Sequence, residues 1–253
     1  TMALTAFVHG ERIEYLHRRC PAIDIHGVNA YGGAVAVPEQ LRAGRASKPY
    51  VLSEFGPLGP WEVPTTEWGA PFEQTSHEKA GFYRRAFEEG VASAPDLALG
   101  AYAFLWGHKM EGTATWFGML LDDGARTEAV DVMTEIWTGQ LPEDRAPVAE
   151  PLTIEGSGQV EPGTDVRVRT SVVDPEGGTV SVRWALRPES GEYSTGGDFR
   201  PSLPDIDGAI IEGSTSSALV RMPDEPGQYR IFLYAYDAAG NAATANVPLL
   251  VRG

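Results

Sequence analysis

The stretch Lys48-Pro49-Tyr50-Val51-Leu52-Ser53-Glu54-Phe55-Gly56-Pro57 sets the architecture that we expect. A short apolar strand runs from Pro49 to Ser53, leads into a lone carboxylate, and is closed by glycine and proline. At the carboxyl end of a parallel strand, side chains point into the crevice in which α/β proteins carry out chemistry. A carboxylate contributes little to stability there, so Glu54 is the first candidate catalytic residue.

Strands and helices alternate on both sides of this stretch. Strands are predicted at 3–8, 23–29, 49–53 and 97–105, and helices at 11–19, 38–43, 75–89 and 127–137. Thr75 and Glu78 have the spacing of a capping box, and Gly139 supplies a helix stop. Four successive strand–helix units predict parallel strands with crossover helices. The two longest loops follow the third and fourth strands, and loops of that length are usually functional.

A different pattern begins after residue 140. Prolines and acidic residues dominate 141–151, which we interpret as a linker. Beyond it, apolar residues alternate with polar ones at 166–172, 180–186 and 229–235, with turn residues between these runs. This pattern predicts an antiparallel β-sandwich of the immunoglobulin-like kind, with Trp184 in its core. The expected domains are therefore 1–140, an α/β part, and 152–253, an all-β part.

Composition excludes several classes of partner. The 253 residues carry a formal net charge of -15, which argues against nucleic acid and against anionic membranes. No apolar run is long enough to cross a bilayer. The single cysteine, Cys20, excludes an internal disulfide, and the scattered histidines do not have the spacing of a metal site. We expect no metal and no cofactor.

Aromatic and polar side chains gather at the predicted strand ends. Asn29 and Tyr31 follow the second strand, Glu54 the third, and Trp106 the fourth, while the loops add Trp61, Trp68, Trp116 and Glu111. Indole faces stack on the apolar faces of sugar rings, and carboxylates and amides bind sugar hydroxyls, so the pattern favours a carbohydrate ligand. Each residue also has a structural alternative, because a loop indole can simply anchor its own loop and Tyr31 can be a rim residue.

Three segments together resemble a known family. They are Ile23-Asp24-Ile25-His26-Gly27-Val28-Asn29-Ala30-Tyr31-Gly32-Gly33, Pro49 to Gly56, and Phe104-Leu105-Trp106-Gly107. In order and spacing they resemble strands six, seven and eight of the clan A (β/α)8 glycoside hydrolases, and most of all bacterial proteins of the family 2 TIM-barrel or family 5-like type. Residues 109–119 also resemble that group. The resemblance implies an α/β half-barrel of strands five to eight over residues 1–140.

The resemblance also implies roles for individual residues. Glu54 takes the position of the nucleophile in a retaining mechanism, Tyr31 that of the aromatic residue that hydrogen-bonds it, and Trp106 that of the floor of the sugar subsite. The clan's proton donor is a glutamate of an Asn-Glu pair that ends strand four, and no such pair occurs here. Three alternatives stay open: the chain is a fragment, a second polypeptide completes the barrel, or two copies pair their half-barrels. Glu62, Glu67 and Glu111 are weaker candidates for the proton donor.

Two hypotheses follow. The first is the C-terminal portion of a retaining glycoside hydrolase or transglycosidase that acts on glucan-like polysaccharide, with the sandwich as an accessory module for packing or carbohydrate contact. The second is a non-catalytic carbohydrate-binding or structural protein. The resemblance implies an extracellular or periplasmic location, although no signal peptide is visible in the sequence.

Overall fold

The computed structural model describes residues 1–6, 10–191, 193 and 200–253. The chain divides into two compact units, one formed by residues 1–59 and 81–105 and the other by residues 60–80 and 106–253. We call them the α/β unit and the β-rich unit and describe each by itself.

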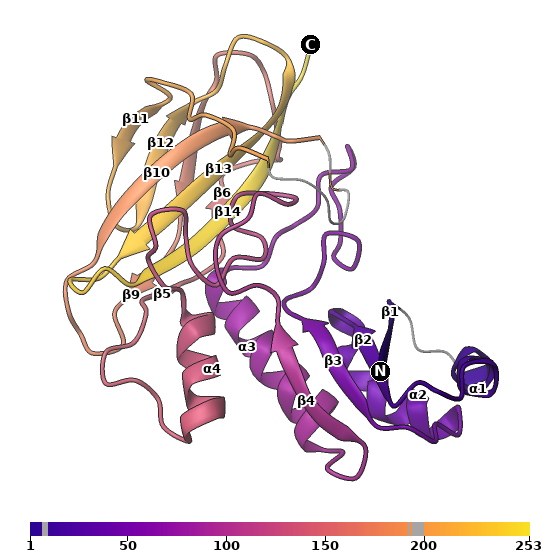
Figure 1. Ribbon diagram of the computed structural model, residues 1–253. Helices are drawn as coiled ribbons and strands as arrows, with labels where there is room; N and C mark the ends of the chain where they lie inside the picture. The colour runs from indigo at the N-terminus through magenta and orange to yellow at the C-terminus, as the bar shows by residue number, and fades with distance from the viewer. Residues whose placement is uncertain (7–9, 192, 194–199) are drawn as a thin grey trace. The chain divides into compact units, whose positions relative to one another are not determined.

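The α/β unit contains one sheet of four parallel strands in the order β1-β2-β3-β4 (Figure 1). The strands are β1 (Met2–Thr5), β2 (Ile25–Asn29), β3 (Tyr50–Phe55) and β4 (Ala98–Ala103). The helical segments between them are α1 (Gly10–Arg19), η1 (Gly32–Ala36), α2 (Val37–Ala43), α3 (Ser76–Phe87) and the π-helical turn η2 (Glu88–Ala92). The predicted series of parallel strands is confirmed, while residues 7 and 8 of the first predicted strand lie outside the described residues.

The two faces of this sheet differ. Val28, Tyr50 and Leu52 are buried together with Leu41 and Ala34 of the helical segments, as expected for side chains that alternate along parallel strands. On the opposite face, a Cβ at Gly27 would lie 2.2 Å from Leu4 Cδ2 and close to Met2 and Ser53. Glycine at this position therefore lets the side chains of β1 and β3 lie over β2.

Two helix ends have the chemistry that their sequence predicts. At the start of α3, Thr75 N donates to Glu78 Oε2 over 2.7 Å and Glu78 N donates to Thr75 Oγ1 over 3.2 Å, which is a reciprocal capping box. Helix α4 (Glu128–Thr138) ends at Gly139, whose φ of 78° is left-handed, a conformation that glycine adopts at little cost.

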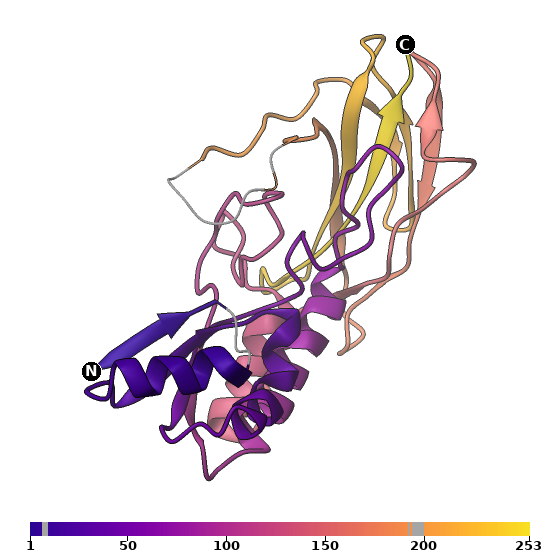
Figure 2. The ribbon, with the colours of Figure 1, turned by 90° about the vertical axis from the view of Figure 1, so that its right-hand side faces the viewer.

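The β-rich unit is built on a β-sandwich, whose strands run from salmon to yellow in Figures 1 and 2. One sheet has the order β10-β13-β14-β7 and the other the order β11-β12-β8-β6. Their bounds are β6 (Thr153–Ile154), β7 (Gln159–Val160), β8 (Asp165–Arg169), β10 (Ser181–Pro188), β11 (Ile210–Gly213), β12 (Ser217–Arg221), β13 (Gly227–Tyr236) and β14 (Ala242–Val251). Pairing is antiparallel except between β14 and β7. The predicted pattern of alternating strands is thus confirmed.

A shared apolar core joins the two sheets. Val168, Val220, Ile231 and Leu249 are buried in it, and so is Trp184, as predicted. The Trp184 indole Nε1 donates to the Ser214 carbonyl over 2.9 Å, which satisfies its only polar atom.

The segment predicted as a linker is packed. Residues 148–149 form β5 (Val148–Ala149), which pairs with β9 (Val172–Val173), and Ala146 and Ala149 are buried. Ala146 N donates to Asp131 Oδ2 over 2.7 Å. The compact units also differ in extent from the predicted domains, because both long loops group with the sandwich. The domain limits 1–140, 141–151 and 152–253 stay a prediction. Among the described residues, no helix combines the length and the apolar character needed to cross a membrane.

Candidate functional site

Glu54 lies at the carboxyl end of β3, next to the end of β2. Val28 pairs with Leu52, but the next residue of β2, Asn29, pairs with Glu54, so β3 contains one extra residue at Ser53. An extra residue of this kind is a bulge, which redirects the side chains that follow it and is common beside active sites. The half-buried Glu54 therefore follows a local break in the strand alternation, which the sequence pattern does not reveal.

The Glu54 carboxylate is hydrogen-bonded by a residue that follows the neighbouring strand. Tyr31 Oη donates to Glu54 Oε2 over 3.0 Å, and both side chains are half-buried. The backbone supports the approach, since Ala30 N donates to the Glu54 carbonyl over 2.9 Å. A hydrogen bond to an ionised carboxylate is stronger than one between neutral groups and fixes the direction of the carboxylate.

A close contact between β3 and the end of β4 holds the Tyr31 ring. A Cβ at Gly56 would lie 2.7 Å from the Phe104 carbonyl oxygen and 3.4 Å from Tyr31 Cε1, so only glycine fits without a shift. Tyr31 packs edge-on against the Phe104 ring at 5.9 Å between centroids. The buried Tyr83 donates to the Phe104 carbonyl over 2.5 Å, and burial raises the pKa of its phenol. The position of the Tyr31 ring is thus fixed by packing, independently of the hydrogen bond between its hydroxyl and Glu54.

Asn29 also lies at this end of the sheet but contacts a different neighbour. Ser53 Oγ donates to Asn29 Oδ1 over 2.8 Å, which joins the ends of β2 and β3 through their side chains. Asn29, Tyr31 and Glu54 are therefore gathered at adjacent strand ends, as the sequence predicts. Ser53, Gly56 and Tyr83 complete the arrangement. Sequence reasoning missed their roles, because only the sheet register and α3 bring them to this place.

Every other carboxylate of the α/β unit lies away from the carboxyl ends of its strands. Glu11, Glu14, Glu39, Glu88 and Glu89 lie on helical segments. Asp24 precedes β2 and accepts from the Thr1 amino group over 2.6 Å, and Asp96 precedes β4 and pairs with Arg42 over 2.8 Å. Among the described residues of this unit, Glu54 is the one carboxylate at the carboxyl end of a strand.

Two of the predicted aromatic residues present exposed indoles in the β-rich unit. Trp106 is 58% exposed, and its ring centroid lies 6.3 Å from that of Trp137 on α4. Trp61 is 49% exposed and lies 6.3 Å from the buried Phe117 ring. Both indoles have accessible surface on which an apolar ligand face can stack.

The remaining predicted contacts are placed differently. Trp116 is 1% exposed, so its indole has no accessible face on which a sugar can stack. Glu111 is buried and pairs with Lys109 over 2.5 Å. Trp68 is half-buried, and a Cβ at Gly158 would lie 3.0 Å from its indole Cη2. The positions of Trp116 and Trp68 fit the alternative in which an indole anchors its own loop. Substrate contact by Trp116, Trp68 and Glu111 stays a prediction.

Glu67, another proton-donor candidate, is engaged elsewhere on the surface. Its Oε2 accepts from Gln159 Nε2 over 2.9 Å. In the part of the chain that the structure describes, no group of three or more histidine, cysteine, aspartate or glutamate side chains has a metal-binding arrangement.

Comparisons with known proteins give remote likenesses. No family model and no curated protein matches the sequence. Among solved structures, a β-glucuronidase of Bacteroides uniformis matches 98% of this chain at 12% identity with a TM-score of 0.35, and this chain spans 28% of its length. The PKD1 domain of Vibrio anguillarum Epp matches 44% of this chain and 98% of its own length at 17% identity, with a TM-score of 0.26. A PKD domain of an M14-like peptidase from a Thermoplasmatales archaeon matches 44% of this chain and 99% of its own length at 14% identity, with a TM-score of 0.27.

Proposed function

We propose that Glu54 is the nucleophile of a retaining glycoside hydrolase or transglycosidase that acts on glucan-like polysaccharide. The hydrogen bond from Tyr31 to Glu54 at the carboxyl ends of two neighbouring parallel strands carries this proposal. It is the arrangement that the resemblance to the clan A (β/α)8 hydrolases implies. In that mechanism the carboxylate attacks the anomeric carbon while the glycosidic C–O bond breaks and the acid protonates the leaving oxygen. The covalent glycosyl-enzyme intermediate is then resolved by water, or by an acceptor hydroxyl in a transglycosidase.

Each proposed role follows from the position of the residue. Tyr31 orients the carboxylate oxygen that does not attack and stabilises its charge before substrate arrives. Trp106 forms the floor of the sugar subsite, because its indole is exposed and follows directly after the segment that contains β4. Asn29, joined to Ser53, is placed to bind a sugar hydroxyl through its amide nitrogen.

The proton donor comes from outside the α/β unit. A retaining enzyme needs a second carboxyl group about 5–5.5 Å from the nucleophile, and the other acids of this unit lie on helical segments or before the strands. The edge strands support completion by further strands. Leu4 on β1 is 60% exposed and Tyr102 on β4 is 68% exposed, whereas parallel sheets are normally covered on both faces. We propose that further strand–helix units, from the same polypeptide, a second polypeptide or a second copy, complete the barrel and supply the acid, in an extracellular or periplasmic protein.

A mechanism-based fluorosugar or epoxide tests the nucleophile. The natural polypeptide is incubated with the probe and digested, and the labelled peptide is found by mass spectrometry. We expect one label on the peptide that contains Glu54, no label in Glu54→Gln, and normal labelling in the control Glu39→Gln, whose exposed carboxylate lies on α2. Absence of label in the wild-type protein, or label that persists in Glu54→Gln, overturns the proposal.

The second candidate function is non-catalytic carbohydrate binding. It is favoured by the same absence of a second carboxylate at the strand ends of the α/β unit. This function predicts retention by a glucan in affinity electrophoresis without any covalent labelling, and Glu54→Gln leaves that retention largely unchanged. The two candidate functions therefore differ in whether the Glu54 carboxylate is covalently labelled.

A further inference from the structure

The outer face of the sandwich sheet that contains β10, β13 and β14 carries an unusual set of polar and aromatic residues. Along β13, Tyr229, Ile231, Leu233 and Ala235 face the sandwich core, so Arg230, Phe232, Tyr234 and Tyr236 face outward. Several of these outward side chains are nevertheless buried, including Arg230, Phe232 and Tyr234. Residues 60–80 and 106–127, which we call the β3 loop and the β4 loop, are the segments that cover them.

Arg230 joins the β3 loop to the sheet. Its Nη2 donates to the Pro71 carbonyl over 2.8 Å, although the two residues are 159 positions apart. Its Nη1 donates to Asn246 Oδ1 over 2.6 Å, and its Nε donates to Glu189 over 2.8 Å. Arg230 is 1% exposed, so all these bonds form away from water, where the loss of one partner is costly.

A buried ion pair within the β3 loop is also hydrogen-bonded to the β4 loop. Lys79 Nζ forms an ion pair with Glu73 and donates to the Thr115 carbonyl over 2.6 Å. Glu73 also accepts from the Thr113 and Thr115 hydroxyls, over 2.5 Å and 2.8 Å. Burial opposes the charge on Glu73, but Lys79 and then Arg230 hold the pKa of this carboxyl below its usual range. The negative charge of Glu73 is thus balanced by Lys79 of the same loop and by Arg230 of the sheet, while two hydroxyls of the β4 loop donate to it.

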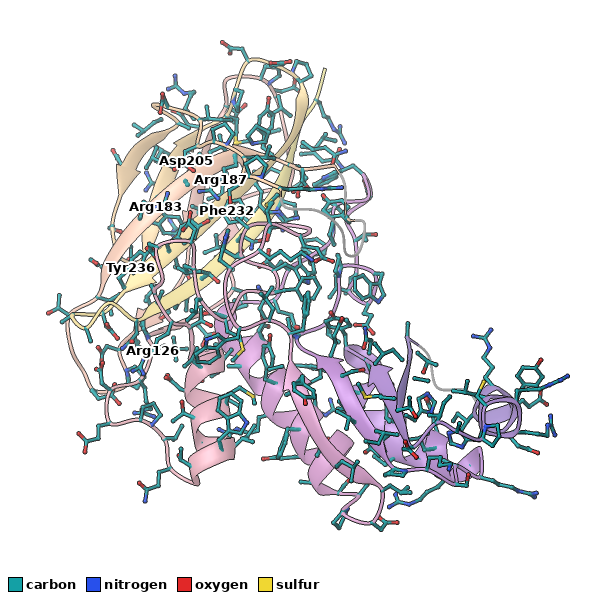
Figure 3. All side chains as sticks on the ribbon, in the orientation of Figure 1. Arg126, Arg183, Arg187, Asp205, Phe232 and Tyr236 are labelled. Carbon is teal, nitrogen blue, oxygen red and sulfur yellow. The ribbon has the colours of Figure 1, made fainter. Side chains whose placement is uncertain are left out.

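The β4 loop has its own attachment to the outer face. Leu121 packs with Phe232, Tyr234 and Ala242 in a small apolar cluster. Tyr236 Oη donates to Asp123 Oδ2 over 2.9 Å, and Arg126 bonds Asn241. Figure 3 labels Arg126, Phe232 and Tyr236 beside Arg183, Arg187 and Asp205, which form surface ion pairs on the same face.

The tip of the β3 loop is attached to residues 158–159 of the sandwich, while the Trp61 indole of the same loop stays exposed. Glu67 accepts from Gln159 of β7, and Trp68 lies against Gly158. Trp61 lies before these attachments and keeps half of its surface exposed, with Phe117 of the β4 loop behind it. The attachments therefore determine where the Trp61 indole is held.

From these contacts we infer that the sandwich is a mount for the two loops, that Arg230 is the positioning residue of the β3 loop, and that the exposed Trp61 indole held on that loop is a stacking platform for a sugar ring of a polysaccharide. The ligand part of this inference rests on the proposed function, whereas the mounting part does not. Loop residues cover the part of the outer sheet face around Arg230, Phe232 and Tyr234, so these side chains are not open to a ligand.

Hydrogen exchange followed by mass spectrometry tests the mount without any ligand. In Arg230→Lys, which keeps the charge beside Glu189 and shortens the reach to Pro71, we expect amides in 64–74 to exchange at least about tenfold faster, as for loss of a charged hydrogen bond. Arg230→Met is expected to give a larger increase. Peptides from β8 and β12 stay unchanged in Arg230→Lys. The matched control is Arg183→Met, on the same face of β10 but paired with the exposed Asp205. Unchanged exchange in 64–74, or an equal increase in β8 and β12, overturns the mount.

Affinity electrophoresis through a glucan gel tests the presented indole. We expect Trp61→Ala and Arg230→Lys to weaken binding to the glucan at least about tenfold, the scale of one lost stacking platform. Arg183→Met should be retained like the wild-type protein. Equal retention of the wild-type protein and both variants overturns the role of Trp61. If the wild-type protein is not retained, the ligand part of the inference fails, while the exchange experiment still decides on the mount and the label on Glu54 decides on the proposed nucleophile.

Discussion

The Tyr31 hydroxyl and the Glu54 carboxylate, 23 residues apart in the chain, meet over 3.0 Å at the ends of neighbouring parallel strands. The ring of Tyr31 is held by Phe104 and by the close approach of Gly56 to the end of β4. The hydroxyl therefore reaches Glu54 from a fixed direction, which is what a carboxylate needs in order to present one oxygen to a reaction partner.

Removal of this hydroxyl is the first prediction. Tyr31→Phe keeps the ring and its packing but removes a hydrogen bond to a charged group, which is worth about 1.5–3 kcal/mol. We expect the rate of Glu54 labelling by a fluorosugar to fall about 10- to 100-fold, since each 1.4 kcal/mol is about tenfold in rate. Tyr102→Phe, an exposed tyrosine of β4 in the same unit, is the control. An unchanged labelling rate in Tyr31→Phe would show that the hydrogen bond does not assist Glu54.

A glycine exchange tests the packing that holds Tyr31. The Cβ of Gly56→Ala would lie 2.7 Å from a backbone carbonyl, so β3 and the end of β4 must move apart. We expect a loss of about 1–3 kcal/mol in the free energy of unfolding, as for other overpacked sites. Gly81→Ala is the matched control, because a Cβ there meets nothing within 4 Å and the position is inside α3. That change should stabilise by about 0.5–1 kcal/mol. Urea unfolding measures both, and equal effects would contradict the model of the contact.

Acid should weaken the α/β unit through a buried histidine. Burial, and then the nearby charge of His17, lower the pKa of His26 below its usual value of 6.5. Burial and then Lys48 lower the pKa of His17 in the same way. Below pH 6.5 the unfolded chain binds protons that the folded chain refuses, so stability is lost as the pH falls, by at most about 1.4 kcal/mol per pH unit for each histidine.

Urea unfolding between pH 8 and pH 5 measures this dependence. In His26→Gln we expect a flatter decline below pH 6.5 than in the wild-type protein, with pH 8 as the reference at which both chains carry the same charge at this position. A decline that is as steep in the variant as in the wild type would assign the acid sensitivity to other groups.

Loss of the buried ion pair between Lys79 and Glu73 should lower the free energy of unfolding strongly. Lys79→Met leaves Glu73 as a buried charge without its nearest cation, and such changes typically cost about 3–5 kcal/mol. The double variant Glu73→Gln/Lys79→Met should recover part of that loss, because no buried charge is then uncompensated. Arg85→Met on the same helix removes only an exposed pair with Glu89 and should have little effect. Calorimetry compares the variants, and a harmless Lys79→Met would contradict the importance of the pair.

Local chemistry made several elements of both units predictable. The β3 strand, the capping box of Thr75 and Glu78 and the stop at Gly139 depend on residues close in sequence, and each is found where the pattern predicts it. The meeting of Tyr31 with Glu54 follows from parallel strands whose carboxyl ends share one edge of the sheet.

Other features depend on contacts that no local pattern encodes. The bulge at Ser53 is a property of the register between two strands. The burial of Trp116 and of Glu111 depends on how their loop packs. The sequence shows only that an indole and a carboxylate are present in this loop, and not that both are buried. In the sequence, Arg230 is one of the polar residues of an alternating strand. Its hydrogen bond to Pro71 depends on the fold, which brings together two residues that are 159 positions apart.

The covered outer face of β13 also limits how this chain can diverge. A module whose outer sheet face is bare can be exchanged between proteins as a cassette, because nothing else depends on its surface. Here a substitution at Arg230 removes the hydrogen bond that holds the β3 loop at Pro71, and this loop begins soon after Glu54. Substitutions in the sheet therefore require compensating substitutions in the loop. Grafting another sandwich onto this α/β unit would therefore require a redesigned pair of loops, and a change of ligand preference could arise from a residue far along the chain from the one that meets the ligand.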